Sequence, residues 1–244
     1  MSNGSPVSDL VSRLFRGDTF VVMSPEAIKR AVEKGMATAT VKPDISPEDA
    51  INNLFEVRRN RAKENASKIL PYPDCDEEIL HLYDQIGLCI LFDMHGAAIM
   101  FCGILVEYAL KRATFISETR DNVEFDLEKW KKFEKIRLKK ATDRAKKSGL
   151  IDQEQAKNIE RFADEVRNPY AHFNLQKITE EMVYSNAVEM NIETGQTKVV
   201  DILASCSPVY MRFAKEGVDK ESVDSVFSYC DKVVRYLWSR LPAR

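Results

Sequence analysis

The stretch IGLCILFDMHGAAIMFCGILVEYAL, residues 86–110, is the most apolar part of this 244-residue chain and sets its fold class. Asp93, His95 and Glu107 interrupt the stretch, and its uncharged run, residues 96–106, is too short to span a bilayer. We therefore expect a buried core helix here and no membrane association.

Apolar residues recur at three- and four-residue steps around the start of this stretch, which is the period of one buried helix face. They are Ile79, Leu82, Tyr83, Ile86, Ile90 and Met94. The periodicity predicts a long helical region from about Asp76 to Ile116, in which His95-Gly96 could introduce a bend.

Three more helices are predicted downstream. The segment LEKWKKFEKIRLKKATDRAKKSGLI, residues 127–151, is expected to form one helix that Ser148-Gly149 ends. A helix from about Asp152 follows, with Gln155 in capping-box position. An amphipathic helix is expected from Val218 onward. The inward-facing side chains expected in the first helix are Trp130, Phe133, Ile136 or Arg137, and Ala141; those of the last are Val223, Val226, Phe227, Cys230, Val233, Val234, Leu237 and Leu241.

The segment VYSNAVEMNIETGQTKVVDIL, residues 183–203, has a different pattern. It is rich in Val, Ile and Thr with polar residues interleaved, which is typical of strands. The residues Glu193-Thr194-Gly195-Gln196 supply a good hairpin turn. We expect a small β-hairpin before the C-terminal helix.

Residues 1–70 are expected to form an N-terminal helical appendage. Ser24-Pro25-Glu26 and Ser46-Pro47-Glu48-Asp49 each place a capping residue, a proline and an acid in the order that starts a helix. The two helices would run to about Lys34 and Leu70, and residues 36–45 between them fit a short strand or an extended link. Because Pro71-Tyr72-Pro73-Asp74 is a strong helix breaker, we expect a second domain over residues 71–244.

Composition excludes several classes of protein. Nine glycines and nine prolines argue against collagen-like or turn-rich chains, and the net charge of −2 does not by itself indicate a nucleic-acid binder. The sequence contains no GxxxxGK[ST] or GxGxxG loop and no GxSxG elbow. Five scattered cysteines without a CxxC pair, together with an N-terminus unlike a signal peptide, favour a cytoplasmic protein without a metal site.

The informative motif is DEVRNPYAHFN, residues 164–174. It resembles the R-x(4–6)-H signature of the HEPN superfamily, compact helical bundles that include many metal-independent RNases. In that family a polar residue, often Asn, follows the Arg, so Arg167, Asn168 and His172 match residue by residue. The order of helices over residues 76–244 is also similar. The resemblance implies a mainly α, up-and-down helical bundle, to which the small β-hairpin and the N-terminal helical appendage are added.

The spacing within the motif has a geometric consequence. On a straight helix, residues five apart are separated by roughly 140° around the axis, so Arg167 and His172 would not share a face. Pro169 removes an amide donor and disfavours helical geometry at Asn168. We therefore predict a distorted helix end that directs Arg167, Asn168 and His172 toward one pocket.

The resemblance implies a metal-independent endoribonuclease without a cofactor, and a defence or toxin-like protein with an antitoxin or other partner protein. A neutral imidazole can take or give a proton near pH 7, and a guanidinium can hold a phosphate. Arg167 and His172 would be catalytic, with Asn168 assisting. Because one His per chain supplies an acid or a base and not both, the resemblance also implies a homodimer with its motifs facing each other.

A basic segment could bind the RNA backbone. Residues 129–147 contain ten basic residues against Glu134 and Asp143, a net charge of +8 that leaves −10 for the rest of the chain. Such a segment can bind phosphates without reading bases, although a solvated helix face is an equal alternative. The predicted substrate-binding residues are Lys131, Lys132, Lys135, Lys139 and Lys140.

Two other functions remain open from the sequence. One is a non-catalytic HEPN module that binds a nucleotide or a partner protein. The other is a purely helical scaffold, in which Arg167 would be tied to Asp164 and His172 would be buried.

Overall fold

The computed structural model describes residues 47–119, 126–191 and 194–241 of the chain. Helix α3 (Pro47–Asn65) begins at the predicted proline but ends before Leu70, and a short 3-10 turn, η1 (Ala66–Lys68), follows it. The predicted helix at 24–34 and the predicted strand or link at 36–45 lie outside the described residues.

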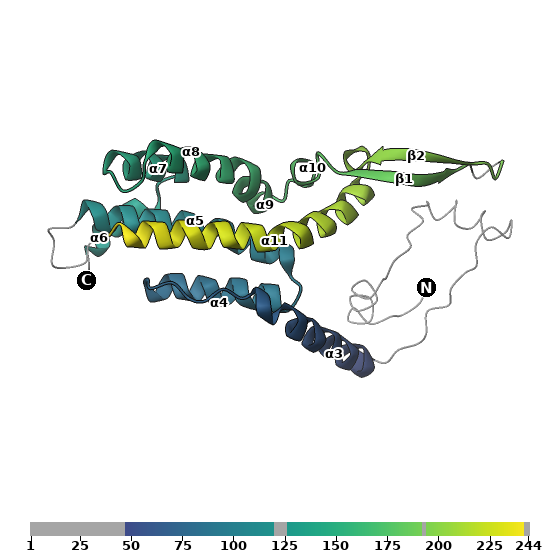
Figure 1. Cartoon of the computed structure of the whole chain (residues 1–244), viewed down its shortest axis with the longest axis horizontal. Coiled ribbons are helices and arrows are strands. Elements are labelled where there is room, and N and C mark those ends of the chain that lie inside the picture. Colours follow the sequence, from purple (N-terminus) through teal and green to yellow (C-terminus); the bar gives the residue numbers. More distant parts are fainter. Residues whose placement is uncertain (1–46, 120–125, 192–193, 242–244) are drawn as a thin grey trace.

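The helical region predicted for residues 76–116 consists of two helices, α4 (Glu77–Leu91) and α5 (His95–Glu118), which pack side by side (Figure 1). The prediction of one bent helix was therefore wrong. The break lies at residues 92–94, where Asp93 has a φ of 63° in the left-handed region. A non-glycine residue in that region cannot continue a right-handed helix, so the chain turns back at this point.

The segment 127–151, predicted as one helix, also forms two: α6 (Leu127–Glu134) and α7 (Leu138–Lys147). They separate because each packs in a different place. Trp130 and Phe133 of α6 lie 5.3 and 5.6 Å, between ring centroids, from Phe115 in a small cluster of their own. Helix α7 instead buries Leu138, Ala141 and Ala145 in the main core.

The predicted helix starting near Asp152 is confirmed as α8 (Gln153–Phe162). The Asp152 side chain accepts a hydrogen bond from the backbone N of Gln155 at 2.8 Å, which caps the first turn. Gly149, in the loop that separates α7 from α8, has a φ of 74°, and this left-handed conformation suits glycine.

The small β-hairpin is confirmed: β1 (Val183–Met190) pairs antiparallel with β2 (Thr197–Leu203). It projects from one end of the molecule, beyond the short helix α10 (Leu175–Ile178) (Figure 1). The C-terminal helix α11 (Pro208–Ser239) begins ten residues before the predicted start at Val218. Its start is a Ser207-Pro208 pair, the same signal that marks α3.

Helix α5 lies at the centre of the bundle. It packs against α11 and α4, and also against α7 and the residues that follow α8 (Figure 1). Burying each large aliphatic side chain contributes roughly 1.5–3 kcal/mol, so these contacts hold the helices together. The fully buried core side chains of α5 and α11 include Ile99, Leu105, Val106, Leu110, Val223, Phe227, Val234 and Leu237. The chain is therefore mainly α, as predicted, and none of its described helices is long and apolar enough to cross a membrane.

Candidate functional site

The backbone of the motif is distorted, and the distortion lies just before the proline. Helix α8 runs into a π-helical segment, η2 (Ala163–Arg167), and then into the four-residue helix α9 (Asn168–Ala171). Pro169 follows in the first turn of α9 and has no N–H to donate to the turn before it, whereas Asn168 N bonds the carbonyl of Ala163, five residues back. A π-helical turn holds an extra residue and so rotates the residues after it, and such turns are frequent at functional sites.

Arg167, Asn168 and His172 line one cavity of about 760 Å³. The walls of this cavity come from α5, from α7 with the link before it, and from the segment α8 to α9. The expectation that the three side chains share one pocket therefore agrees with the geometry.

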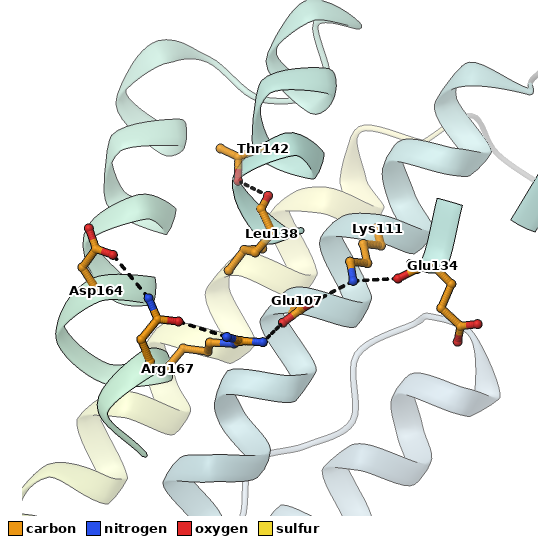
Figure 2. Close-up of polar contacts among 8 residues, drawn as sticks. Glu107, Lys111, Glu134, Leu138, Thr142, Asp164 and Arg167 are labelled. Atoms are coloured by element: carbon orange, nitrogen blue, oxygen red, sulfur yellow. Dashed lines mark hydrogen bonds and ion pairs between the residues drawn. The ribbon is translucent and has the colours of Figure 1, made fainter. Parts of the chain in front are cut away.

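Arg167 is held by two partners. Its Nη2 donates to Glu107 Oε2 of α5 at 2.6 Å, and its Nη1 donates to Asn168 Oδ1 at 3.0 Å (Figure 2). The side chain keeps 30% of its surface exposed. A Cβ on Gly103, one turn before Glu107, would come within 3.0 Å of Arg167 Cγ. Glycine at position 103 therefore lets the arginine lie directly on α5.

Glu107 joins Arg167 to a second cation. Its Oε1 accepts a hydrogen bond from Lys111 Nζ at 2.7 Å, and the buried Lys111 also donates to the backbone carbonyl of Glu134 at 2.8 Å (Figure 2). Burial alone would raise the pKa of Glu107, but the hydrogen bonds and charges of Lys111 and Arg167 outweigh it and hold that pKa below its ordinary value. Glu107 therefore stays ionised and holds the guanidinium of Arg167 at the cavity wall.

Glu107 and Lys111 were not among the predicted site residues. The available signal was that Glu107 interrupts the most apolar stretch of the chain, four residues before a lysine. A charge in a buried helix is expected to have a partner. The spacing could predict the Glu107–Lys111 pair, but the contact with Arg167, sixty residues away, depends on the tertiary fold.

His172 is exposed and lies at the C-terminal end of α9, where its backbone N donates to Asn168 O at 3.0 Å. The side chain of Asn168 also donates to Asp164 Oδ1 at 3.4 Å, so it bridges Asp164 and Arg167. The scaffold alternative expected a buried His172 and an Arg167 tied to Asp164. The structure differs on both points: His172 is exposed, and the ionic partner of Arg167 is Glu107.

The predicted substrate-binding lysines divide into two groups. Lys135 and Lys139 line the cavity, together with Arg137. Lys131, Lys132 and Lys140 are not part of its lining, and Lys131 pairs with Glu128 of its own helix at 2.9 Å. The basic segment thus contributes three cations to one wall of the cavity, while its remaining lysines lie elsewhere on α6 and α7.

Comparison with known proteins gives no match: no family model, no curated protein and no solved structure is similar enough to report. Within the described ranges, no group of three or more His, Cys, Asp or Glu side chains is arranged to hold a metal ion.

Proposed function

We propose that the chain is a metal-independent endoribonuclease of HEPN type. The observation that carries the proposal is the cavity that combines Arg167, Asn168 and His172 with a cationic wall of Lys135, Arg137 and Lys139. A guanidinium and an imidazole beside a row of cations suit a phosphodiester better than a neutral substrate.

The cleavage chemistry needs two proton transfers. The 2′-oxygen of a ribose attacks the adjacent phosphorus and loses its proton, and the 5′-oxygen leaves and gains one. The products are a 2′,3′-cyclic phosphate and a 5′-hydroxyl. The exposed imidazole of His172 performs one of these transfers. Arg167, oriented by Glu107, binds a non-bridging oxygen and stabilises the charge that develops on it.

The second proton transfer requires another group, and we propose the His172 of a second copy of the chain. In a two-fold dimer each motif would face its equivalent, so one site would contain two imidazoles. Met100 and Ile104 of α5 support this proposal. They remain 39% and 44% exposed and lie within a turn of Gly103 on the helix that carries Glu107. Apolar side chains so close to a charged site suit a contact with another protein surface.

The test is RNA cleavage in EDTA by wild type, His172→Ala and His81→Ala. His81 is an exposed histidine of α4 that does not line the cavity, so its replacement is the matched control. We expect His172→Ala to lose at least a hundredfold in rate and His81→Ala to keep the wild-type rate. A substrate with a 2′-deoxyribose at the cleavage position should resist cutting.

Two results would contradict the proposal. One is a His172→Ala protein that cuts RNA as fast as wild type, and the other is loss of the wild-type activity in EDTA. If no cleavage occurs but a nucleotide stabilises the wild type against heat, the non-catalytic binding module becomes the better description.

A further inference from the structure

The short helix α9 places His172, and it needs external support. Helix α9 is the last turn of an unbroken helical run that begins at Gln153, and a terminal turn frays more easily than the middle of a helix. The next residue, Phe173, has a φ of 50° in the left-handed region, so the helix ends there. The orientation of His172 therefore depends on what holds α9 against the bundle.

The polar anchor of α9 is Tyr170. This half-buried side chain donates from its hydroxyl to Asp219 Oδ1 of α11 at 2.6 Å. Burial and the neighbouring carboxylate both raise the pKa of Tyr170, so the phenol keeps the proton that makes this bond.

Asp219 is fixed from several sides. It is only 7% exposed and pairs with Lys215 one turn earlier on α11. A Cβ on Gly96, in the first turn of α5, would come within 2.5 Å of Asp219 Oδ2. The Lys215 Nζ also lies 5.1 Å from the ring centroid of Tyr170 and 5.8 Å from that of Phe173. Lys215 thus contacts the rings at both ends of the segment that contains His172.

Arg167 and His172 are consequently fixed to different helices. Arg167 is held on α5 through Glu107, and α9 is held on α11 through Tyr170. Helices α5 and α11 pack tightly against each other in the core. These two anchors therefore add to the helical backbone of residues 167–172 in holding the guanidinium and the imidazole relative to each other.

We propose that Tyr170 is a positioning residue for the site: its bond to Asp219 sets α9 and directs His172 into the cavity beside Arg167. This inference rests on the proposed function for its kinetic effect, but the placement of the imidazole can be measured without RNA.

The experiment compares Tyr170→Phe with Tyr83→Phe. Tyr83 is a buried tyrosine of α4 whose hydroxyl donates to Asp231, also on α11, at 2.8 Å. Both variants lose one tyrosine–aspartate hydrogen bond to the same helix, so both should lose stability. Only Tyr170→Phe should lower kcat about tenfold or more with KM within about twofold.

Proton NMR of the imidazole signals provides the readout that does not need activity. The chain has three histidines, and the spectrum of His172→Ala identifies the signal of His172. We expect Tyr170→Phe to shift or broaden that signal and to leave the signal of His81 unchanged. If wild type does not cut RNA but the signal moves, the proposed function fails and the positioning role stands. A His172 signal and a kcat that match those of Tyr83→Phe would overturn the positioning role.

A second pair of variants covers the possibility that Tyr170→Phe unfolds. Asp219→Asn retains an oxygen that can accept the hydrogen bond of Tyr170, whereas Asp219→Ala does not. We expect the Asn variant to retain the wild-type position of the His172 signal and the Ala variant to lose it. Equal signals in the two variants would also contradict the proposal.

Discussion

Neutralising Glu107 tests the row of ion-paired side chains, Lys111, Glu107 and Arg167, that lines the cavity. In Glu107→Gln the side chain keeps its shape, but Lys111 and Arg167 bond different oxygens of Glu107, so the single amide oxygen can replace the acceptor of only one of them. The amide NH₂ then faces the other cation. The variant therefore removes one of the two charge-assisted hydrogen bonds, at 2.7 and 2.6 Å, and weakens the other without removing packing.

The magnitude follows from the two bonds. A hydrogen bond to a charged group contributes about 1.5–3 kcal/mol, so the bond that would face the amide NH₂ loses about this amount, while the other bond keeps its charged donor and loses less. The Lys111 side chain is 10% exposed and loses close to the full value, whereas the Arg167 side chain, 30% exposed, loses less through solvent screening. We expect a loss of about 2 kcal/mol in the free energy of unfolding, or a Tm lower by about 4–8 °C.

The stabilisation by ionised Glu107 should also depend on pH. Because the folded-state pKa of Glu107 is below its ordinary value of 4.5, the carboxylate stabilises the fold above that pH. This stability is lost as the pH falls through the folded-state pKa. The difference between wild type and Glu107→Gln should thus be full at pH 7 and shrink below about pH 4.5.

Urea unfolding at pH 7 and at pH 3.5 measures both effects, with Glu128→Gln as the control. Glu128 forms an exposed pair with Lys131, so its neutralisation should change the stability by less than about 0.5 kcal/mol. If Glu107→Gln were as stable as Glu128→Gln at pH 7, the reasoning about the buried pair would be refuted.

Three further predictions concern the surroundings of the site. Gly103→Ala should displace Arg167 and destabilise the fold by about 1–3 kcal/mol in urea unfolding, whereas Gly217→Ala, whose Cβ would meet nothing within 4 Å, should be neutral or stabilising by up to about 1 kcal/mol. Lys135→Gln with Lys139→Gln should weaken RNA binding in a filter assay and reduce the salt slope by about 2, whereas the control pair at Lys131 and Lys140, outside the cavity, should reduce it less. Asp152→Ala should remove the cap of α8 and lower the free energy of unfolding by about 1 kcal/mol, with an unchanged RNA-binding salt slope.

Sequence reasoning located most helices because their cause is local. The Ser46-Pro47 start predicted α3, Asp152 with Gln155 in capping-box position predicted α8, and alternation predicted the hairpin. It missed the breaks at 92–94 and 135–137, because each is decided by where the flanking helices pack. The left-handed conformation of Asp93 turns the chain so that α5 runs back along α4. No local pattern in the residues FDMH, 92–95, predicts that reversal.

The same distinction explains the site. Arg167, Asn168 and His172 could be predicted because they are neighbours in the sequence and match a family signature. Their anchors could not, because Glu107 and Asp219 lie 60 and 49 residues from the side chains they hold. Such partners are chosen by the packing of α5 and α11, which the sequence indicates only as two apolar helix faces.

The charge of the cavity walls adds a final constraint on the substrate path. Glu160 and Asp164, on the α8 side, line the cavity together with Lys135, Arg137 and Lys139 on the α7 side. A polyanion is repelled by the first wall and attracted by the second, so a bound phosphate backbone should follow α7 and reach Arg167 from that side. The net charge of −2 does not indicate this separation of acidic and basic side chains, because the cations of residues 129–147 are offset by acids elsewhere in the chain. The local field at the cavity, rather than the total charge, is therefore the relevant quantity for the proposed binding of RNA.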